Sequence, residues 1–246
     1  MDELFLRNRM LWGDDAQDRL AASHVILFGL GGVGSYTAEC LARSGLGELT
    51  LVDQDTVSLS NRNRQLEALE STVGLQKADA VAARLRDIHP ALKLHPISAT
   101  YDTLHRDLFF PDGCRYDYIV DAIDLVSCKL DLAETALRLN IPLIAALGTG
   151  NKLDPSLLRI ADISETYGCP LARVMRKELR ARGIRHLKVV FSPEEPHACG
   201  SCLQQELPPP GRRSIPASSP WVPATAGLLL GSAVVRDLIA KGGSPC

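Results

Sequence analysis

Short apolar runs alternate with amphipathic stretches along the first 147 residues of the chain. A short apolar run is typical of a buried strand, and an apolar period of about 3.6 residues is typical of a helix. The pattern predicts strands at 25–28, 49–52, 92–97, 116–123 and 142–147. It predicts helices at 14–22, 35–44, 75–88 and 126–139. This alternation predicts an α/β fold with a Rossmann-like, doubly wound and mainly parallel sheet.

The pattern changes near residue 150, which divides the chain into two predicted parts. Residues 1–150 are predicted to form the Rossmann-like core with an N-terminal helix, and residues 151–246 a C-terminal α+β extension. The extension is predicted to contain strands at 158–163 and 187–191, a basic helix at 171–182, a Pro-rich loop at 193–220 and a final packing helix at 221–240. The loop lacks periodicity, so we interpret it as mobile or functional. Gly227 and Gly231, four residues apart in the final helix, favour close packing.

Composition and charge are those of a soluble protein that buries a core, with 46% hydrophobic and 23% charged residues. The formal net charge of −2 excludes a global basic field, so any contact with nucleic acid would have to be local. The N-terminus lacks the basic-then-apolar pattern of a signal peptide. The longest apolar stretch, 221–235, is expected to be too short for a membrane span. We therefore expect a cytoplasmic protein without membrane contact.

A glycine-rich turn joins the first predicted strand to the helix that follows it. Gly29, Gly31 and Gly34 have the G-x-G-x-x-G spacing, which lets a phosphate approach the backbone closely. The N-terminus of the next helix offers free N–H groups to such an anion. Asp53 ends the second predicted strand, where a carboxylate can accept both hydroxyls of a ribose. These features predict a nucleotide site; the alternative is a turn whose glycines serve only helix–sheet packing.

Further polar residues follow the predicted strands at the edge where ligands bind to such sheets. With Asp53 they form the set Asn61, Arg64, Gln65, Lys77 and Asp124. Two cations and a carboxylate distant from the ribose suit a triphosphate with Mg²⁺ better than a dinucleotide, which needs little added positive charge. We therefore expect ATP and Mg²⁺ as cofactors.

Each of these residues has a simpler interpretation as well. Arg64 could be a solvated loop residue, and Lys77 could be a surface residue in the first turn of a helix. A cation at a helix N-terminus opposes the helix dipole, which favours an anionic ligand near Lys77. We interpret Asp121 as a strand-end residue and Asp124 as the better metal ligand.

Four ordered motifs resemble those of one enzyme superfamily. They read Gly-Leu-Gly-Gly-Val-Gly-Ser, Leu-Val-Asp-x-Asp-x-Val-x-x-Ser-Asn-x-x-Arg-Gln, Val-Gly-x-x-Lys and Asp-Ala-Ile-Asp, within a match from about Leu11 to Thr149. The chain resembles the ubiquitin-activating-enzyme-like adenylyltransferase superfamily of the ThiF/MoeB type. The resemblance implies that a substrate carboxylate is adenylated at the α-phosphate of ATP, with release of pyrophosphate.

The same resemblance implies roles for individual residues. Those implied to hold ATP are Gly32 and Asp53 at the nucleoside end and Asn61, Arg64 and Lys77 at the phosphates. Asp124 is implied to hold magnesium. Arg7, at the matching spacing before Leu11-Trp12-Gly13, is implied to reach the phosphates across a homodimer, although the family's earlier arginine is Leu4 here. Arg64, Lys77, Asp124 and Arg7 are the catalytic residues under this hypothesis.

Two segments resemble the branch of tRNA threonylcarbamoyladenosine dehydratases: residues 169–183 and Ser127-Cys128-Lys129. This resemblance implies ATP-dependent dehydration of N6-threonylcarbamoyladenosine next to the tRNA anticodon, with ring closure after adenylation. Between Arg173 and Lys188 there are seven Lys or Arg residues and one acid, Glu178. This composition predicts a cationic stripe that contacts tRNA phosphates, and a solvated helix face is the alternative.

Two other functions stay open at the level of the sequence. The first is an adenylyltransferase that activates the C-terminal glycine of a ubiquitin-like or sulfur-carrier protein, with that carrier or a sulfur-transfer protein as partner. Such enzymes tend to carry Asn-Leu-Gln-Arg-Gln where this chain has Asn61-Arg62-Asn63-Arg64-Gln65. The second is an NAD-dependent dehydrogenase or a nucleotide-sensing module, which would be indifferent to the loss of Arg64.

The seven cysteines are an odd number and do not suggest a disulfide framework. Cys199-Gly200-Ser201-Cys202 is a single pair beside His197, whereas a zinc site needs about four ligands. Cys169 is the nearby residue that could be added, and Cys246 lies at the chain end. We favour a redox pair or coincidental loop cysteines. Cys128 or Cys199 would be reactive only if its pKa were lowered.

Overall fold

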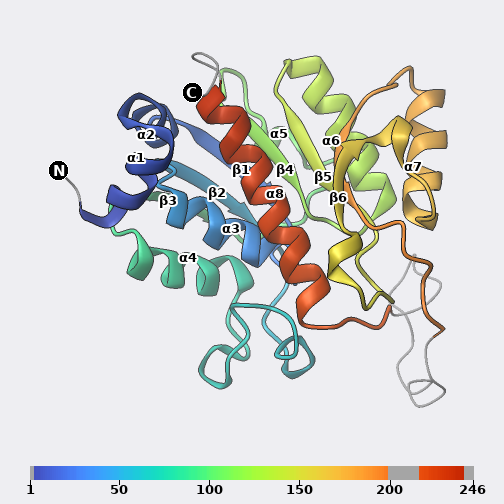
Figure 1. Ribbon diagram of the computed structural model, residues 1–246, viewed down its shortest axis with the longest axis horizontal. Helices are drawn as coiled ribbons and strands as arrows, with labels where there is room; N and C mark the ends of the chain where they lie inside the picture. Colours follow the sequence, from blue (N-terminus) through green and yellow to red (C-terminus); the bar gives the residue numbers. More distant parts are fainter. Residues whose placement is uncertain (1–2, 199–215, 241–246) are drawn as a thin grey trace.

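The computed structural model describes residues 3–198 and 216–240 of the chain. The strands form one seven-stranded sheet in the spatial order β3-β2-β1-β4-β5-β7-β6 (Figure 1). They are β1 (His24–Phe28), β2 (Glu48–Val52), β3 (Lys93–Ile97), β4 (Tyr118–Asp121), β5 (Leu143–Ala146), β6 (Arg159–Asp162) and β7 (Lys188–Phe191). Neighbouring strands are parallel except for the antiparallel pair β6–β7. The predicted α/β fold with a mainly parallel sheet is confirmed.

Helices cover both faces of this sheet (Figure 1). The α-helices are α1 (Leu6–Trp12), α2 (Asp14–Ala21), α3 (Gly34–Ser44), α4 (Lys77–Ile88), α5 (Arg106–Phe109), α6 (Val126–Leu139), α7 (Pro170–Ala181) and α8 (Trp221–Ala240). The 3-10 turns are Glu3–Phe5, Leu59–Asn61, Glu70–Thr72, Pro155–Leu157 and Ile163–Glu165. Helices α3, α4 and α8 pack on one face, and α5, α6 and α7 on the other.

Strand β1 illustrates why the core strands read as continuous apolar runs. Val25 and Leu27 pack among residues of α3, α4 and α8, whereas Ile26 and Phe28 pack among residues of α5 and α6. Successive side chains of a strand point to opposite faces, and here each face is covered by helices. Both sets of side chains must therefore be apolar, as is usual for parallel sheets.

Helix α8 confirms the predicted final packing helix. A Cβ added at Gly227 would lie 2.3 Å from the Val33 carbonyl oxygen, and one added at Gly231 would lie 2.7 Å from Cys40 Sγ. The two glycines therefore let α8 approach α3 closely. The expectation that this apolar stretch is too short for a membrane span was wrong. The helix runs for 20 residues and is, by length and composition alone, long and apolar enough to cross a membrane. Its apolar side chains are instead largely buried in the core of the sheet protein.

Two predicted elements have different bounds in the structure. The helix predicted to begin at 75 begins at Lys77, because Val57 N donates to the Leu75 carbonyl and Gln76 forms an isolated bridge with Thr56. The strand predicted at 116–123 is confined to Tyr118–Asp121. Helix α1 was not predicted from periodicity: none of its residues is buried, so it carries no apolar stripe toward the core.

The C-terminal extension continues the same sheet. Strand β7 pairs in parallel with β5, β6 closes the edge, and residues of α8 share a core cluster with those of β1 and α3. Most of the Pro-rich loop predicted at 193–220 lies outside the described residues, so its interpretation stays a prediction.

Candidate active site

The site predicted from the sequence lies where the sheet changes direction. The chain leaves β1 toward α3 on one face and leaves the adjacent β4 toward α6 on the other face. The carboxyl ends of β1, β2 and β4 therefore meet at one edge, beyond which doubly wound sheets bind their ligands.

The glycine-rich turn after β1 leaves room for close backbone contacts. Gly29 has a φ of +86°, and a Cβ added there would lie 2.8 Å from the Ala122 carbonyl oxygen. A Cβ at Gly34 would lie 1.8 Å from the Gly29 carbonyl oxygen. The first and third glycines of the motif are thus required by the turn and by packing. Because Gly29 packs against Ala122, the turn that carries Asp124 lies directly beside the glycine-rich turn.

The middle of the same turn faces the polar loop that follows β2. A Cβ added at Gly31 would lie 3.6 Å from Gln65 Nε2, and one at Gly32 would lie 3.4 Å from Arg64 Cγ. The nearest atom to a Cβ at Gly32 would be Pro223 Cβ at 3.2 Å, so a side chain there would crowd both Pro223 and Arg64. Because neither glycine carries a side chain, none covers their backbone N–H groups. The structure thus brings together two sequence motifs that lie about 30 residues apart.

Asp53 is held against this turn by two backbone hydrogen bonds. Its Oδ2 accepts from the Leu30 N–H at 2.6 Å, and its Oδ1 accepts from the Asp55 N–H at 2.8 Å. Burial raises the pKa of Asp53, and nearby Lys77 acts in the opposite direction. The carboxylate is fixed at the end of β2, at the position where a ribose is expected.

The loop after β2 orders Asn61 and Arg64. Asn61 Oδ1 accepts from the Ser58 N–H at 3.0 Å, which forms a capping box around a 3-10 turn. Arg64 Nη1 donates to the Ser60 carbonyl at 3.1 Å and to Asn63 Oδ1 at 2.9 Å. Burial lowers the pKa of this half-buried guanidinium, and it forms no ion pair with a carboxylate of the described residues. Glu67 is a nearby acid that acts to raise this pKa, although it forms no ion pair with Arg64 among the described residues. A partly desolvated cation whose hydrogen-bond acceptors are neutral favours an anionic ligand.

Gln65, next to Arg64, is buried and incompletely hydrogen-bonded. Its Oε1 has no hydrogen-bond partner among the described residues, and its Nε2 faces Gly31. A buried amide oxygen without a donor is costly unless a ligand or water supplies one. The side chain is therefore suited to a polar ligand at the glycine-rich turn.

Lys77 is buried at the first position of α4, which excludes the surface interpretation. Its Nζ donates to Asp55 Oδ2 at 2.9 Å, and this ion pair offsets the unfavourable helix dipole. Asp55 is itself largely exposed. Lys77 Nζ could therefore form an ion pair with a phosphoryl oxygen in place of Asp55 while its side chain stays buried at the site.

Asp121 and Asp124 have different surroundings after β4. Asp121 is the last residue of β4 and is buried; Lys129 Nζ donates to its Oδ2 at 3.0 Å and to the Ala146 carbonyl at 2.7 Å. This confirms Asp121 as a strand-end residue. Asp124 is exposed in the turn before α6, so it is the carboxylate that solvent or a metal ion can reach.

Arg7 does not lie near these residues within one chain. It is exposed on α1, and the neighbouring Asn8 Nδ2 donates to the Arg43 carbonyl at 3.0 Å. Arg43 is in the last turn of α3, whereas the glycine-rich turn precedes its first turn. A helix of this length spans about 16 Å, so Arg7 lies toward the opposite edge of the sheet.

Glu67 is a residue of this region that the sequence analysis missed. It is buried, and neither carboxylate oxygen has a hydrogen-bond partner among the described residues. Burial raises the pKa of Glu67 to about 7; Lys77 acts to lower it and Asp53 to raise it. The sequence feature that could have identified Glu67 is an acidic residue between the apolar Leu66 and Ala68, directly after the Arg-Gln motif.

The cysteines contribute no activated thiol to the described part of the site. Cys128 is buried, and its Sγ donates to the Tyr101 carbonyl at 3.1 Å. Burial raises the pKa of Cys128, so the condition for its reactivity is not met. Cys199, Cys202 and Cys246 lie outside the described residues, so the zinc and redox interpretations stay predictions.

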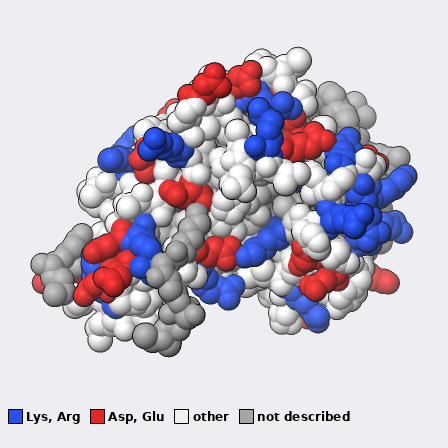
Figure 2. Space-filling model, turned by 90° about the horizontal axis from the view of Figure 1, so that it is seen from above, with Lys and Arg blue, Asp and Glu red and all other residues white. Residues whose placement is uncertain are grey.

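The basic segment around α7 is smaller than the sequence predicted. Four exposed cations form no ion pair with a carboxylate of residues 3–198 or 216–240: Arg173, Lys177, Arg180 and Arg185. Arg182 is paired with Glu134 and Glu178, and Lys188 with Asp237. We call the four exposed residues the basic surface. Figure 2 shows Lys and Arg gathered at the right of the view, the end of the molecule where α7 lies in Figure 1.

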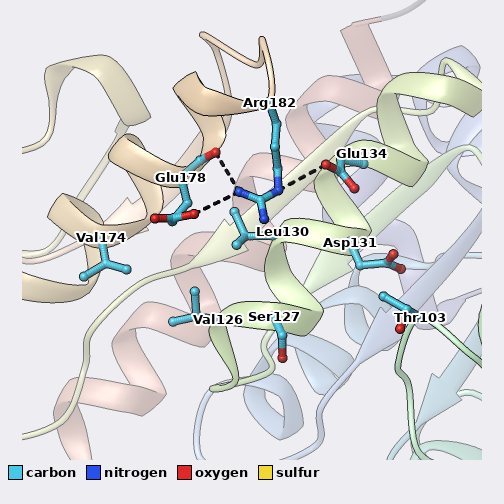
Figure 3. A pocket seen from close by; sticks show the side chains of 9 residues that line it. All are labelled: Thr103, Val126, Ser127, Leu130, Asp131, Glu134, Val174, Glu178 and Arg182. Atoms are coloured by element: carbon cyan, nitrogen blue, oxygen red, sulfur yellow. Dashed lines mark hydrogen bonds and ion pairs between the residues drawn. The ribbon is translucent and has the colours of Figure 1, made fainter.

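A groove of about 420 Å³ lies between α6 and α7 (Figure 3). Val126 and Ser127, the first residues of α6, form its end nearest to Asp124. Arg182 crosses the other end, where its Nε lies 3.1 Å from Glu134 Oε1 and its Nη1 lies 3.0 Å from Glu178 Oε2. Since acids outnumber cations on its walls, the groove is better suited to a neutral group than to a phosphate.

Proteins of one family are similar to this chain over nearly its whole length. The model of the ThiF family matches residues 5–239. The chain is 40% identical to tRNA threonylcarbamoyladenosine dehydratase of Bacillus subtilis, over 96% of this chain and 94% of the relative. It is 33% identical to the protein of that name from Escherichia coli, over 94% of this chain and 91% of the relative.

A solved structure is similar over nearly the whole length. It is the crystal structure of E. coli tRNA N6-threonylcarbamoyladenosine dehydratase, TcdA, in complex with ATP, with a TM-score of 0.85 and 32% identity. The similarity covers 97% of this chain and 95% of that chain. The resemblance inferred from the four motifs is confirmed, and this chain belongs to the ThiF family.

Proposed function

We propose that this protein is an ATP-dependent tRNA-modifying enzyme that dehydrates and cyclises N6-threonylcarbamoyladenosine next to the anticodon. The proposal is supported by the similarity to dehydratases along almost the whole chain and by the similarity to an ATP-bound structure. The observation that carries it is Arg64: its Cγ lies against the glycine-rich turn, and its half-buried guanidinium hydrogen-bonds to neutral acceptors and forms no ion pair among the described residues.

The residues at the sheet edge fit ATP. The open backbone at Gly31 and Gly32 suits phosphoryl oxygens, and Asp53 at the end of β2 suits the ribose hydroxyls. Four side chains of the following loop and helix would hold the triphosphate: Asn61, Arg64, Gln65 and Lys77. Asp124, exposed beside the turn, would hold Mg²⁺, which would supply further neutralisation of phosphoryl charge.

The chemistry needs no nucleophile from the enzyme. A carboxylate oxygen of the substrate attacks the α-phosphorus, the new O–P bond forms, and the bond to pyrophosphate breaks. A carbamoyl atom of the same side chain then attacks the activated carbonyl carbon, loses its proton, and expels AMP. The substrate loses the elements of water in total, and its oxygen leaves with AMP. Because the second step is intramolecular, orientation supplies much of the rate, and Arg64 and Lys77 stabilise charge at the phosphates in the first.

The basic surface supports a tRNA substrate. Its four side chains are exposed and form no ion pair within the described chain, so they are available to phosphates. Contacts of this kind give affinity without reading sequence, and they weaken as salt increases. The hollow of about 480 Å³ lined by Arg180, Arg185 and His186 adds a concave site for the backbone of the nucleic acid.

A homodimer would bring Arg7 to the site of a second copy. Helix α1 exposes Leu6, Met10 and Leu11, the last two at 79% relative exposure each. Adjacent exposed apolar side chains favour an interface. Since Arg7 lies away from the site of its own chain, its proposed role at the phosphates requires this second copy.

The test is to incubate the protein with ATP and tRNA that carries threonylcarbamoyladenosine. We expect AMP to form in equal amount to nucleoside that has lost one water, as measured by mass spectrometry. Formation of AMP only when a carrier protein with a C-terminal glycine is added, and not with tRNA, would favour the alternative adenylyltransferase. Tight NAD binding with no AMP formed would contradict both.

A further inference from the structure

Three polar side chains meet on the sheet at the edge opposite to the candidate active site. His24 begins β1, Glu48 begins β2, and His95 lies in the middle of β3. In the parallel register His24 is opposite Glu48, and Thr50 is opposite His95. Since alternate residues of a strand share a face, these side chains all project from the same face of the sheet. We call His24, Glu48 and His95 the His–Glu–His cluster.

The distances within this cluster are those of a nearly formed metal site. Glu48 Oε1 lies 2.8 Å from His95 Nε2 and 3.6 Å from His24 Nδ1. One ligand atom of each residue lies within 4.8 Å of the other two. Tetrahedral zinc with bonds of about 2.0–2.1 Å places its ligands about 3.4 Å apart. Side-chain rotations that move atoms by about 1 Å would therefore suffice to surround an ion.

The Thr50 hydroxyl orients the imidazole of His24. His24 Nε2 lies 2.9 Å from Thr50 Oγ1, so a hydrogen bond to Thr50 directs Nδ1 toward Glu48. The His24 ring also packs edge-on against Tyr116, with ring centroids 4.7 Å apart. Such support by a second hydrogen bond is usual for histidines that bind metals. Burial lowers the pKa of His24, which favours the neutral form that can coordinate.

Nearby charges and exposure leave the cluster accessible. Lys93 is opposite Glu48 in the register and is exposed, so it can turn toward solvent. Asp117 lies on the other side, where its Oδ2 accepts from the His24 backbone N–H at 2.9 Å. His95 is exposed, whereas His24 and Glu48 are half-buried. An ion could thus enter from solvent beside His95 and keep a water ligand there.

We propose that the His–Glu–His cluster binds one divalent first-row transition ion, with Zn²⁺ or Co²⁺ as its probe and water in the fourth position. Two imidazoles and one carboxylate are a ligand set that such ions prefer over Mg²⁺. Strand β1 separates the cluster from the glycine-rich turn by about 13 Å, so the ion would not take part in adenylation. It would instead cross-link three adjacent strands and stabilise the fold.

Co²⁺ titration of the nucleotide-free protein tests the proposal, because four-coordinate Co²⁺ absorbs strongly in the visible range. We expect saturation at one equivalent and displacement of the colour by Zn²⁺. His95→Ala and Glu48→Gln are each expected to weaken Co²⁺ binding at least about tenfold. His105→Ala is the matched control, since His105 is an exposed histidine that pairs with Asp102 elsewhere.

Two further measurements separate this site from others and from misfolding. The double variant Cys199→Ser and Cys202→Ser is expected to bind Co²⁺ like the unaltered protein; loss of the signal there would overturn the proposal. Zn²⁺ is expected to raise the Tm of the unaltered protein and of His105→Ala but not of His95→Ala. Equal Co²⁺ binding by His95→Ala and the unaltered protein, with both folded by circular dichroism, would also overturn it. None of these outcomes depends on the proposed tRNA activity.

Discussion

Arg64 and Lys77 at the sheet edge and the cations around α7 are all predicted phosphate ligands, yet their surroundings differ. Arg64 is half-buried with neutral acceptors, and Lys77 is buried and paired with the exposed Asp55. Around α7, Arg182 and Lys188 are neutralised by internal acids, and the four residues of the basic surface are exposed. The cations are thus partly or fully buried in the first region, and the unpaired ones are exposed to water in the second.

The two regions are therefore suited to different kinds of anion binding. A partly desolvated guanidinium in a fixed position can stabilise charge that develops at one atom, because water does not screen the interaction strongly. Exposed cations are screened by salt and contribute to affinity without positioning a reacting group. Under the proposed function, the loop after β2 is expected to carry the phosphoryl chemistry and the basic surface to retain tRNA.

The largest effect is expected for Arg64→Ala. Removing the half-buried cation, whose Cγ lies against the glycine-rich turn, should lower kcat/KM for AMP formation by about 10²–10³-fold. The matched control is Arg62→Ala, since Arg62 lies in the same loop and is already paired with Glu70. Steady-state AMP formation measures both variants. An equal loss in the two variants would show that loop structure, rather than the Arg64 cation, supports the reaction.

The next effect concerns the pH dependence of stability, through Glu67. Burial raises its pKa to about 7, above the ordinary 4.5, so the folded protein binds more protons than the unfolded chain between these values. The free energy of unfolding should therefore fall as pH rises through this window, by up to about 3 kcal/mol, and level off above it. Urea unfolding of Glu67→Gln between pH 5 and 8 should lack this component. The exposed Glu70→Gln should retain it; the same slope in Glu67→Gln and in the unaltered protein would contradict the prediction.

A smaller effect is expected for the double variant Arg173→Ala and Arg180→Ala. Each lost phosphate contact should reduce the slope of log Kd against log salt by about 0.9 and weaken tRNA binding by about tenfold at low salt. Filter binding across a salt series measures both quantities. ATP binding should be unchanged, because these side chains are remote from the glycine-rich turn. Unchanged tRNA affinity would remove the basic surface from the proposed interface.

The smallest effect is expected for Arg182→Ala. Arg182 is held by Glu134 and Glu178 across the groove of Figure 3, so little of its charge is available to tRNA. Its loss should change tRNA affinity by less than about twofold and the free energy of unfolding by about 0.5–1 kcal/mol, since partly exposed ion pairs contribute little. A loss of affinity as large as that of the double variant would mean that ion pairing does not distinguish these cations.

Much of the site followed from local sequence features. The strand–turn–helix order placed Gly29 and Gly34 where the turn and the packing require them, and the apolar runs located every strand of the sheet to within a few residues. Asp53 could be assigned to the end of β2 because it directly follows an apolar run. Helix α8 has the predicted bounds, and its two glycines pack closely as predicted.

Other features could not be predicted because they depend on residues far apart in the chain. The burial of Glu67 depends on its surroundings at α3, β2 and α4, and its own neighbours in sequence do not reveal it. The pairing of Lys188 with Asp237 joins residues 49 positions apart and removes a cation from the predicted stripe. Likewise, the His–Glu–His cluster exists only because three strands lie side by side in one register.

The order of strands and helices, the glycine-rich turn and the family of the chain could all be predicted from the amino-acid sequence. These depend on hydrophobic periodicity and on short motifs, which act between residues that are close along the chain. Which charges are buried, which are neutralised and which polar side chains meet became known from the folded structure. Desolvation and ion pairing depend on distances in space, and the packing of distant segments sets these distances.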